Sequence, residues 1–230
     1  IAIGTVLLPL LSKIDFKNNK IQFIDNVRKS QRLVLLIGLP SCIGIYFCSE
    51  AIIAAIFYRG EFTYIDVIKT SLSLKVLALG LPFFMLMKIL IPSFFSRKLT
   101  RAPVIVAAIS LILNILLNYV FAFIYGYGHI GIAIGSAIAA LISVLILEFI
   151  LIKDGVVKLV NPLNRFNLTL LLSCLVLSVY LIWFNQYFSF QEMNALNRIL
   201  ILSTEVVSAI LLYFICIKVF LGNKLRQVIS

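Results

Sequence analysis

Residues 85–104, MLMKILIPSFFSRKLTRAPV, place a lysine inside an apolar run, followed by a proline, a short basic break and a second apolar run. Lys88 and Pro92 stand in the first run, and the break contains Arg97, Lys98 and Arg101. A charge inside a membrane segment is costly, so such a residue is a functional candidate by default. The stretch predicts two membrane-spanning helices joined by a basic loop, with Lys88 on the first of them.

The same pattern of apolar runs and polar breaks continues along the chain. A helix crosses the hydrocarbon core of a bilayer with about 20 mostly apolar residues. The composition, 62% hydrophobic and 13% charged, is that of an integral membrane protein. The runs are continuous and do not alternate, which excludes barrel strands. We therefore expect an all-α fold, a polytopic integral membrane helix bundle, with spans over 33–57, 70–95, 103–125, 130–152, 167–185 and 199–220.

The first residues, IAIGTVLLPLLS over 1–12, are apolar from the start. They lack an initiating methionine and the basic region that opens a signal peptide. We expect them to be the end of a longer hydrophobic helix, so the chain is expected to be truncated at its N-terminus.

Segment 20–32, KIQFIDNVRKSQR, has apolar residues at helical spacing with charges on the opposite side. Ile21, Ile24 and Val27 form the apolar stripe. The pattern predicts either a helix that lies along the membrane surface or a solvated loop helix.

Lysine and arginine residues indicate which loops face the cytoplasm. Most of them lie in loops 13–32, 96–103 and 153–166 and in the C-terminal end, whereas the intervening loops contain only Arg59 and Arg198. These basic loops and the C-terminus are therefore expected to be cytoplasmic. The net charge of +11 is then a signal of topology and of attraction to anionic lipid headgroups, and we expect no nucleic-acid partner.

Lys88 has two interpretations. It precedes Arg97 by about 13 Å of helix at a rise of 1.5 Å per residue, so its stem could extend toward the basic interface. Alternatively it faces a wet cavity, in a span that Pro82 and Pro92 allow to bend or break, as transporter helices do.

Asn114 and Asn118 lie four residues apart and so on one helix face. Two amide oxygens at this spacing, with Ser136 and the backbone carbonyl of Ile132 on the next span, could hold a small hard cation such as Na⁺. The other interpretation is hydrogen bonding between helices, which amide side chains form routinely in membranes.

Other features of the runs favour structural roles. GIAIGSAIAA over 131–140 has Gly131 and Gly135 at the spacing that lets two helices pack closely. Glu148 is expected at the cytoplasmic interface, and Glu205 lies deeper, with a buried partner that the sequence does not identify. The four cysteines lie in or beside apolar runs without metal-ligand spacing, and no hydrolase or nucleotide-binding motif occurs, so we expect no metal site, no cofactor and no enzyme.

Several segments, in order and spacing, resemble the MurJ/MviN family of lipid II flippases, within the multidrug/oligosaccharidyl-lipid/polysaccharide (MOP) exporter superfamily. The resemblance is strongest over 1–150. It rests on GTVLLPLLS (4–12), LPS (39–41), FYRGEFTYIDV (57–67), KILIPSFFSRKLTRAPV (88–104), LNILLNYVF (113–121) and GHIGIAIGSAI (128–138).

The resemblance implies the C-terminal half of a flippase with fourteen spans. Residues 1–158 would be the second six-helix lobe, N-terminally truncated, and 159–230 two additional helices that form a groove for the lipid tail. Lys88 and Arg97 match basic positions and become candidates for contacting the substrate headgroup. Asn114, Asn118 and Ser136 match a cation site in sodium-linked members, although the carboxylate expected at Asn118 is missing. The first lobe would have to come from elsewhere.

The function implied is the outward movement of an undecaprenyl-linked peptidoglycan precursor across the bacterial inner membrane by alternating access. One alternative is another polysaccharide-lipid or drug exporter of the same superfamily, for which Glu148 and Glu205 are the available proton-coupling carboxylates. A second is a non-transporting fragment of a split or decayed gene.

Overall fold

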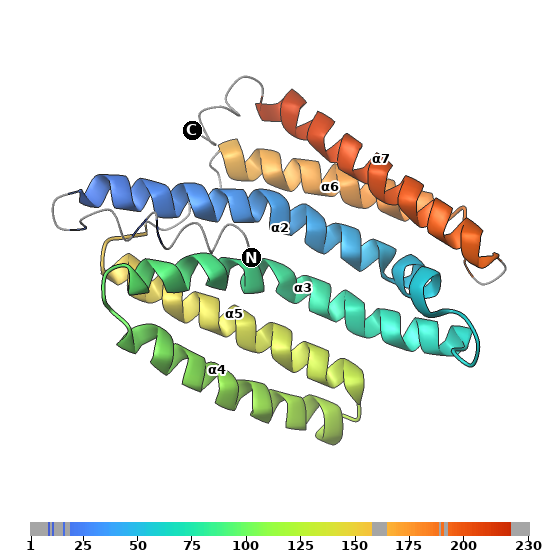
Figure 1. Ribbon diagram of the computed structural model, residues 1–230, viewed down its shortest axis with the longest axis horizontal. Helices are drawn as coiled ribbons and strands as arrows, with labels where there is room; N and C mark the ends of the chain where they lie inside the picture. Colours follow the sequence, from blue (N-terminus) through green and yellow to red (C-terminus); the bar gives the residue numbers. More distant parts are fainter. Residues whose placement is uncertain are drawn as a thin grey trace. The chain divides into compact units, whose positions relative to one another are not determined.

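The computed structural model describes residues 9, 11, 16, 19–157, 165–188, 190 and 193–221. Within these residues the secondary structure is helical and contains no strand. The helices are α2 (Lys20–Phe57), α3 (Tyr64–Phe95), α4 (Arg101–Tyr119) with the π-helical turn η1 (Val120–Ile124), α5 (His129–Lys153), α6 (Arg165–Asn185) and α7 (Ala195–Leu221) (Figure 1). The predicted all-α fold is confirmed. The expectation about residues 1–12 falls almost entirely outside the described residues.

Six of the described helices are long and apolar enough to cross a membrane, which agrees with the six predicted spans. Two of them begin well before their predicted spans, α2 at Lys20 instead of residue 33 and α3 at Tyr64 instead of residue 70. α2 has 38 residues, or about 57 Å at 1.5 Å per residue, and so exceeds the hydrocarbon core of about 30 Å. Neither α2 nor α3 has a helix-breaking loop at the point where its apolar run begins, so the helix continues into the preceding charged segment.

Segment 20–32 is not a separate helix, because it forms the first part of α2. Its buried residues are Phe23 and Val27, both 0% exposed, which pack in a protein core. Ile21, by contrast, is 80% exposed. The apolar stripe predicted from Ile21, Ile24 and Val27 is therefore corrected to one centred on Phe23 and Val27, and it packs against protein.

The prolines of α3 do not break it. Pro82 and Pro92 both lie inside a single helix of 32 residues, so the break that these prolines would allow is absent from the described part of α3. One turn around Pro92 has side-chain support, since the hydroxyl of Ser93 donates a hydrogen bond to the Leu90 carbonyl at 2.6 Å.

The chain divides into two compact units, and α2 and α3 contribute to both. Unit 1 contains the described residues within 1–38 and 80–161, and unit 2 those within 39–79 and 162–227. The predicted domain boundary at 158 and 159 lies outside the described residues, and the division into 1–158 and 159–230 stays a prediction.

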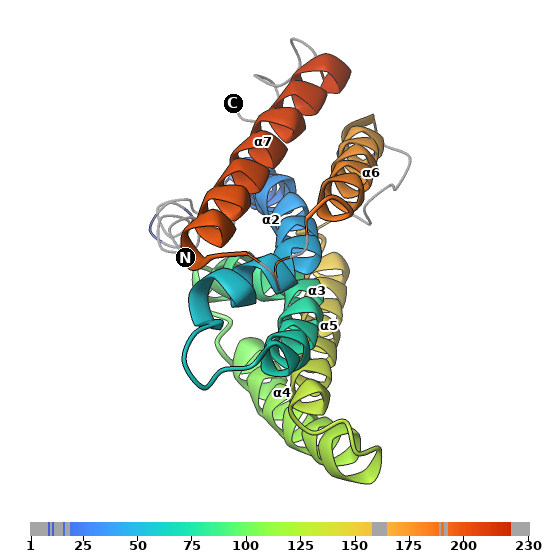
Figure 2. The same ribbon diagram turned by 90° about the vertical axis from the view of Figure 1, so that its right-hand side faces the viewer.

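The core of unit 1 is formed by α3 and α5 together with the first part of α2. Ile89, Leu90 and Phe94 of α3 pack with Leu147 and Leu151 of α5, and each of these side chains is at most 1% exposed. α4 lies alongside α5 in both views (Figures 1 and 2). α4 itself buries only Pro103 and Val106, and most of its large apolar side chains are exposed.

Unit 2 is formed by the rest of α2 and α3 with α6 and α7. A cluster of Ala51, Ala54, Val67 and Phe190 lies where α2 and α3 approach the connection between α6 and α7. α6 and α7 pack against each other (Figure 1). Their contact includes a hydrogen bond of 2.6 Å between Tyr180 and Ser208.

Candidate functional site

Lys88 lies on the exposed side of α3. Its neighbours Leu86, Ile89 and Leu90 are all buried in the core of unit 1. Lys88 forms no hydrogen bond or ion pair within the described part of the chain. The structure therefore directs this cation away from the core of its own unit, toward whatever surrounds α3.

Arg97 follows the end of α3, and its side chain is only 5% exposed. Its Nη1 lies 2.9 Å from Oδ2 of Asp154, just beyond the end of α5. Its Nε donates to the Ser93 carbonyl at 3.1 Å, and the guanidinium lies 5.2 Å from the centre of the Phe94 ring. The pair joins the loop after α3 to the loop after α5.

Lys88 and Arg97 are thus in different environments. One is exposed and the other is buried in an ion pair, so the structure does not bring the two headgroup candidates together. The contact of either residue with a substrate stays a prediction. A second nitrogen of Arg97, Nη2, is buried without a hydrogen-bond partner among the described residues.

The four cation-site candidates lie along the contact between α4 and α5. Nδ2 of Asn118 donates to Oδ1 of Asn114 at 2.9 Å, and Nδ2 of Asn114 donates to Oγ of Ser136 at 3.2 Å. Oδ1 of Asn118 is buried and accepts no hydrogen bond from the described residues. The side chain of Ile132 is exposed, and its backbone lies in α5 one turn before Ser136. The structure brings the three polar side chains together, and cation binding there stays a prediction.

Close packing of α5 against α4 and η1 depends on two glycines. A Cβ built at Gly131 would lie 2.6 Å from the backbone nitrogen of Ala122, and one built at Gly135 would lie 2.9 Å from that of Asn118. These distances are shorter than real Cβ contacts allow. The packing role predicted for GIAIGSAIAA is confirmed.

The turn η1 was not predicted. In it the backbone carbonyls of Val120 and Phe121 accept hydrogen bonds from the amides of Tyr125 and Tyr127, at 3.0 and 3.1 Å. π-helical turns are rare and occur often at functional sites. The sequence signal was the following YGYGH, where Gly126 and Gly128 both have positive φ.

The two carboxylates in apolar runs have partners that sequence reasoning missed. Glu148 accepts a hydrogen bond from Nε2 of Gln31 at 3.3 Å within unit 1. Glu205 is 0% exposed within unit 2 and accepts one from Sγ of Cys48 at 3.3 Å. Among the described residues, no group of three or more His, Cys, Asp or Glu side chains could hold a metal ion.

Arg198 was also missed as a residue of interest. It is 7% exposed, and it donates to the backbone carbonyls of Phe190 at 2.9 Å and Tyr58 at 3.0 Å. Its guanidinium lies 4.1 Å from the centre of the Tyr58 ring. The residue joins the segment after α2 to the segment before α7.

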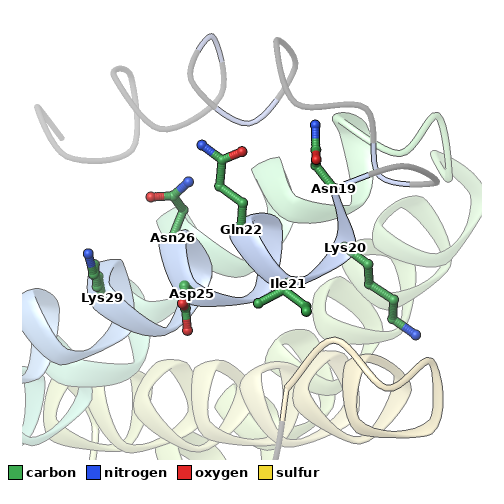
Figure 3. Close-up of a pocket in the computed structure, with 7 residues that line it drawn as sticks. All are labelled: Asn19, Lys20, Ile21, Gln22, Asp25, Asn26 and Lys29. Atoms are coloured by element: carbon green, nitrogen blue, oxygen red, sulfur yellow. The ribbon is translucent and has the colours of Figure 1, made fainter.

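The start of α2 borders a polar cavity of about 650 Å³. Figure 3 shows the side chains of Asn19, Gln22, Asn26 and Lys29 along one side of the helix, with Asp25 on another side. Their spacing is that of one helix face. The basic segment 13–32 thus also carries a row of amide side chains along the start of α2.

A sequence model described as "Lipid II flippase MurJ" matches residues 1–201. A probable lipid II flippase MurJ of Vibrio cholerae is 36% identical over 114 residues, which are 50% of this chain and 22% of that protein. The protein of the same description from Rickettsia prowazekii is 38% identical over 112 residues, which are 48% of this chain and 22% of that protein.

Among solved structures, one described as lipid II flippase MurJ in an inward closed conformation matches with a TM-score of 0.70 and 29% identity. The match covers 99% of this chain and 43% of that chain. This chain therefore spans less than half the length of its solved relative, and the aligned part is about a fifth of the curated relatives.

Proposed function

The chain belongs to the lipid II flippase MurJ family, and we propose that it contributes to moving a lipid-linked peptidoglycan precursor across the bacterial inner membrane. The match to the family over residues 1–201 is the observation that carries this proposal. Six helices able to cross a membrane are in keeping with it. The protein would act as a transporter and not as an enzyme.

Lys88 is the residue that we propose meets the anionic headgroup. A lysine directed into hydrocarbon costs several kcal/mol, about 3 on insertion scales. Lys88 is exposed and unpaired within the described residues, so a diphosphate beside it would offset that cost by a charge-assisted hydrogen bond.

We assign Arg97 a positioning role. Its Nη1 and Nε already bind Asp154 and the Ser93 carbonyl, so most of its donor capacity is used inside unit 1. By fixing the loop between α3 and α4, it would hold the end of the helix that carries Lys88. Only its buried Nη2 is left to reach a phosphate.

The transport mechanism would be alternating access. The headgroup would enter a cavity beside Lys88 from the cytoplasmic side, and rocking of two lobes would then expose it outside. The chain covers 43% of its solved relative, so a segment supplied with it or by a partner chain would form the opposite wall. The lipid tail would remain in the bilayer, against apolar side chains of α6 and α7 such as Leu175 and Leu211, which are both exposed.

We also propose Na⁺ as a coupling ion, whose gradient would supply the driving force. Asn114, Asn118 and Ser136 would hold it, with the Ile132 carbonyl nearby. The buried oxygen Oδ1 of Asn118, which accepts no hydrogen bond within the described part of the chain, supports this assignment because an unsatisfied buried acceptor costs about 1–3 kcal/mol. These ligands are neutral oxygens, a donor type suited to a hard monovalent cation.

The orientation follows from the basic loops. We propose that the loops after α3 and α5 face the cytoplasm together with the C-terminus, because Lys98, Arg101 and Lys153 lie in or directly beside them. The loops after α2 and α6 would then face outward.

Growth of a bacterium depleted of its own lipid II flippase tests this function. We expect residues 1–230 to restore growth when a segment corresponding to the uncovered part of the solved relative is expressed with them, and to fail when they are expressed alone. No growth with that segment present would contradict the transport function, whereas growth with residues 1–230 alone would contradict the need for a further segment.

A further inference from the structure

Unit 2 contains a pocket of about 300 Å³ that the transport function does not use. One acidic and one basic side chain line it, Glu50 of α2 and Lys75 of α3. Asn185 and Gln186, at the end of α6, add two amides, and Phe47 and Phe188 belong to its apolar wall. Every lining residue belongs to the same compact unit.

The two charges do not neutralise each other. No ion pair joins Glu50 to Lys75, and Lys75 makes no hydrogen bond or ion pair within the described part of the chain. Glu50 accepts a hydrogen bond from the hydroxyl of Tyr64, which fixes its carboxylate at the pocket. Both residues lie in helices that could cross a membrane, where unpaired charges are retained for a function or a ligand.

The pocket also offers a hydrogen-bond acceptor beside Glu50. Nδ2 of Asn185 is used by two backbone carbonyls, those of Leu181 at 3.0 Å and Phe47 at 3.3 Å. Neither of these bonds uses its Oδ1, an acceptor atom that can bind an N–H group. The pocket thus combines a cationic donor on one helix with acceptors on two others.

The pocket lies near one end of the helices that form it. Glu50 precedes the end of α2 at Phe57 by about 10 Å, and Lys75 follows the start of α3 at Tyr64 by about 17 Å. α3 has 32 residues, about 48 Å, so it extends beyond a hydrocarbon core of about 30 Å. The charges are therefore at a depth where they can reach lipid headgroups.

We propose that this pocket binds the headgroup of a phospholipid that carries both a phosphate and a primary ammonium. The phosphate would pair with Lys75, and the ammonium would donate to Glu50 and to Oδ1 of Asn185. A purely anionic headgroup leaves Glu50 facing a phosphate, and a quaternary ammonium cannot donate hydrogen bonds to either acceptor. A headgroup with both charges satisfies all three side chains.

Native mass spectrometry of the purified, delipidated chain tests the proposal. Phosphatidylethanolamine, phosphatidylglycerol and phosphatidylcholine with identical acyl chains are added separately, and the bound lipid is counted. We expect one phosphatidylethanolamine to be retained, with an affinity about tenfold above that of the other two lipids. Its primary ammonium forms a charge-assisted hydrogen bond that neither of the other headgroups can form. Lys75→Gln and Glu50→Gln should each lower this affinity by about tenfold. Lys69→Gln is the matched control, an exposed lysine on the same helix outside the pocket, and should bind as the wild type does.

Each other pattern overturns the proposal. Equal retention of phosphatidylglycerol, with no effect of Glu50→Gln, would indicate a site for phosphate alone. Equal retention of phosphatidylcholine would indicate an aromatic site for quaternary amines. Displacement of the lipid by soluble phosphoethanolamine at equal concentration would exclude a lipid as the occupant. The selectivity of the wild type is measured without any variant, so the test does not depend on how the variants fold, which circular dichroism checks separately.

Discussion

Arg97 and Asp154 form an ion pair of 2.9 Å in which the arginine side chain is 5% exposed and the aspartate side chain 34% exposed. The pair connects the loop after α3 to the loop after α5, and it lies beside Phe94 in the core of unit 1. A buried guanidinium that loses its anion is left with an uncompensated charge. The loop between α3 and α4 therefore depends on this contact.

Asp154→Asn should lower the free energy of unfolding by about 2 kcal/mol, because a hydrogen bond to a charged group is lost from a buried partner. Thermal unfolding in detergent, followed by circular dichroism, measures the loss. Asp25→Asn, on the exposed side of α2, is the control and should change stability little. The double variant Arg97→Gln/Asp154→Asn should lose less than the sum of the single variants. Additive losses would show that the two side chains do not interact.

Gly131→Ala should destabilise the protein by about 1–3 kcal/mol, because overpacking against backbone atoms forces the helices apart. The nearest atoms to the added methyl group are backbone atoms of Phe121 and Ala122. Gly44→Ala in α2 is the matched control, since a Cβ there meets nothing within 4 Å. That control should be neutral or stabilising. A Gly131→Ala protein as stable as Gly44→Ala would contradict the close approach of α5 to η1.

Arg198→Gln should lower stability by about 3 kcal/mol, because two hydrogen bonds from a charged group to backbone carbonyls are lost. It should also increase proteolytic cleavage within 58–63, since the Tyr58 carbonyl loses its donor. Limited proteolysis with mass spectrometry locates the cuts. Arg59→Gln, an exposed neighbour, should leave the pattern unchanged. If Arg198→Gln resisted proteolysis as well as the wild type does, the hydrogen bond from Arg198 to the Tyr58 carbonyl would not be what protects residues 58–63.

Na⁺ should raise the melting temperature relative to the same concentration of K⁺, because a bound ion stabilises the folded state by mass action. Asn118→Leu should abolish the difference by removing the unsatisfied oxygen and the bond to Asn114. Asn167→Leu, which replaces a polar residue of α6, is the control and should retain the difference in melting temperature between Na⁺ and K⁺. Identical melting in both salts would indicate that the three side chains serve only to hold α4 against α5.

The number and the type of the helices could be predicted because each depends on local composition. An apolar run of sufficient length suffices to indicate a span, whatever it packs against. The starts of α2 and α3 could not be placed in this way. Both helices continue through charged residues such as Arg28 and Asp66, which a helix tolerates on an exposed face but which end a hydropathic run.

The candidate cation site was also accessible from spacing. Asn114 and Asn118 share a face because they lie on one helix, and Ser136 was named with them as a hydroxyl on the next span. The pairs Arg97–Asp154 and Cys48–Glu205 could not be found in this way, since 57 and 157 residues separate their members. No periodicity links positions on different helices. The only available signal was a charged residue in or beside an apolar run, which predicts that a partner exists but does not identify it.

The exposure of Lys88 could not be predicted from the sequence either. Its position in an apolar run could be read from the sequence, but the face of α3 on which it lies depends on how Ile89, Leu90 and Phe94 pack with α5. That packing leaves Lys88 exposed.

The most direct test is the amount of lipid II that reaches the outer leaflet in flippase-depleted cells that express residues 1–230 together with the further segment described above. An externally added enzyme that cleaves lipid II measures this amount. The wild type should restore cleavage, Lys88→Ala should reduce its rate by about tenfold through loss of a charge-assisted hydrogen bond, and Lys88→Arg should retain most of it. Lys69→Ala should behave as the wild type. Cleavage at the wild-type rate in Lys88→Ala would contradict the proposed contact between this lysine and the headgroup.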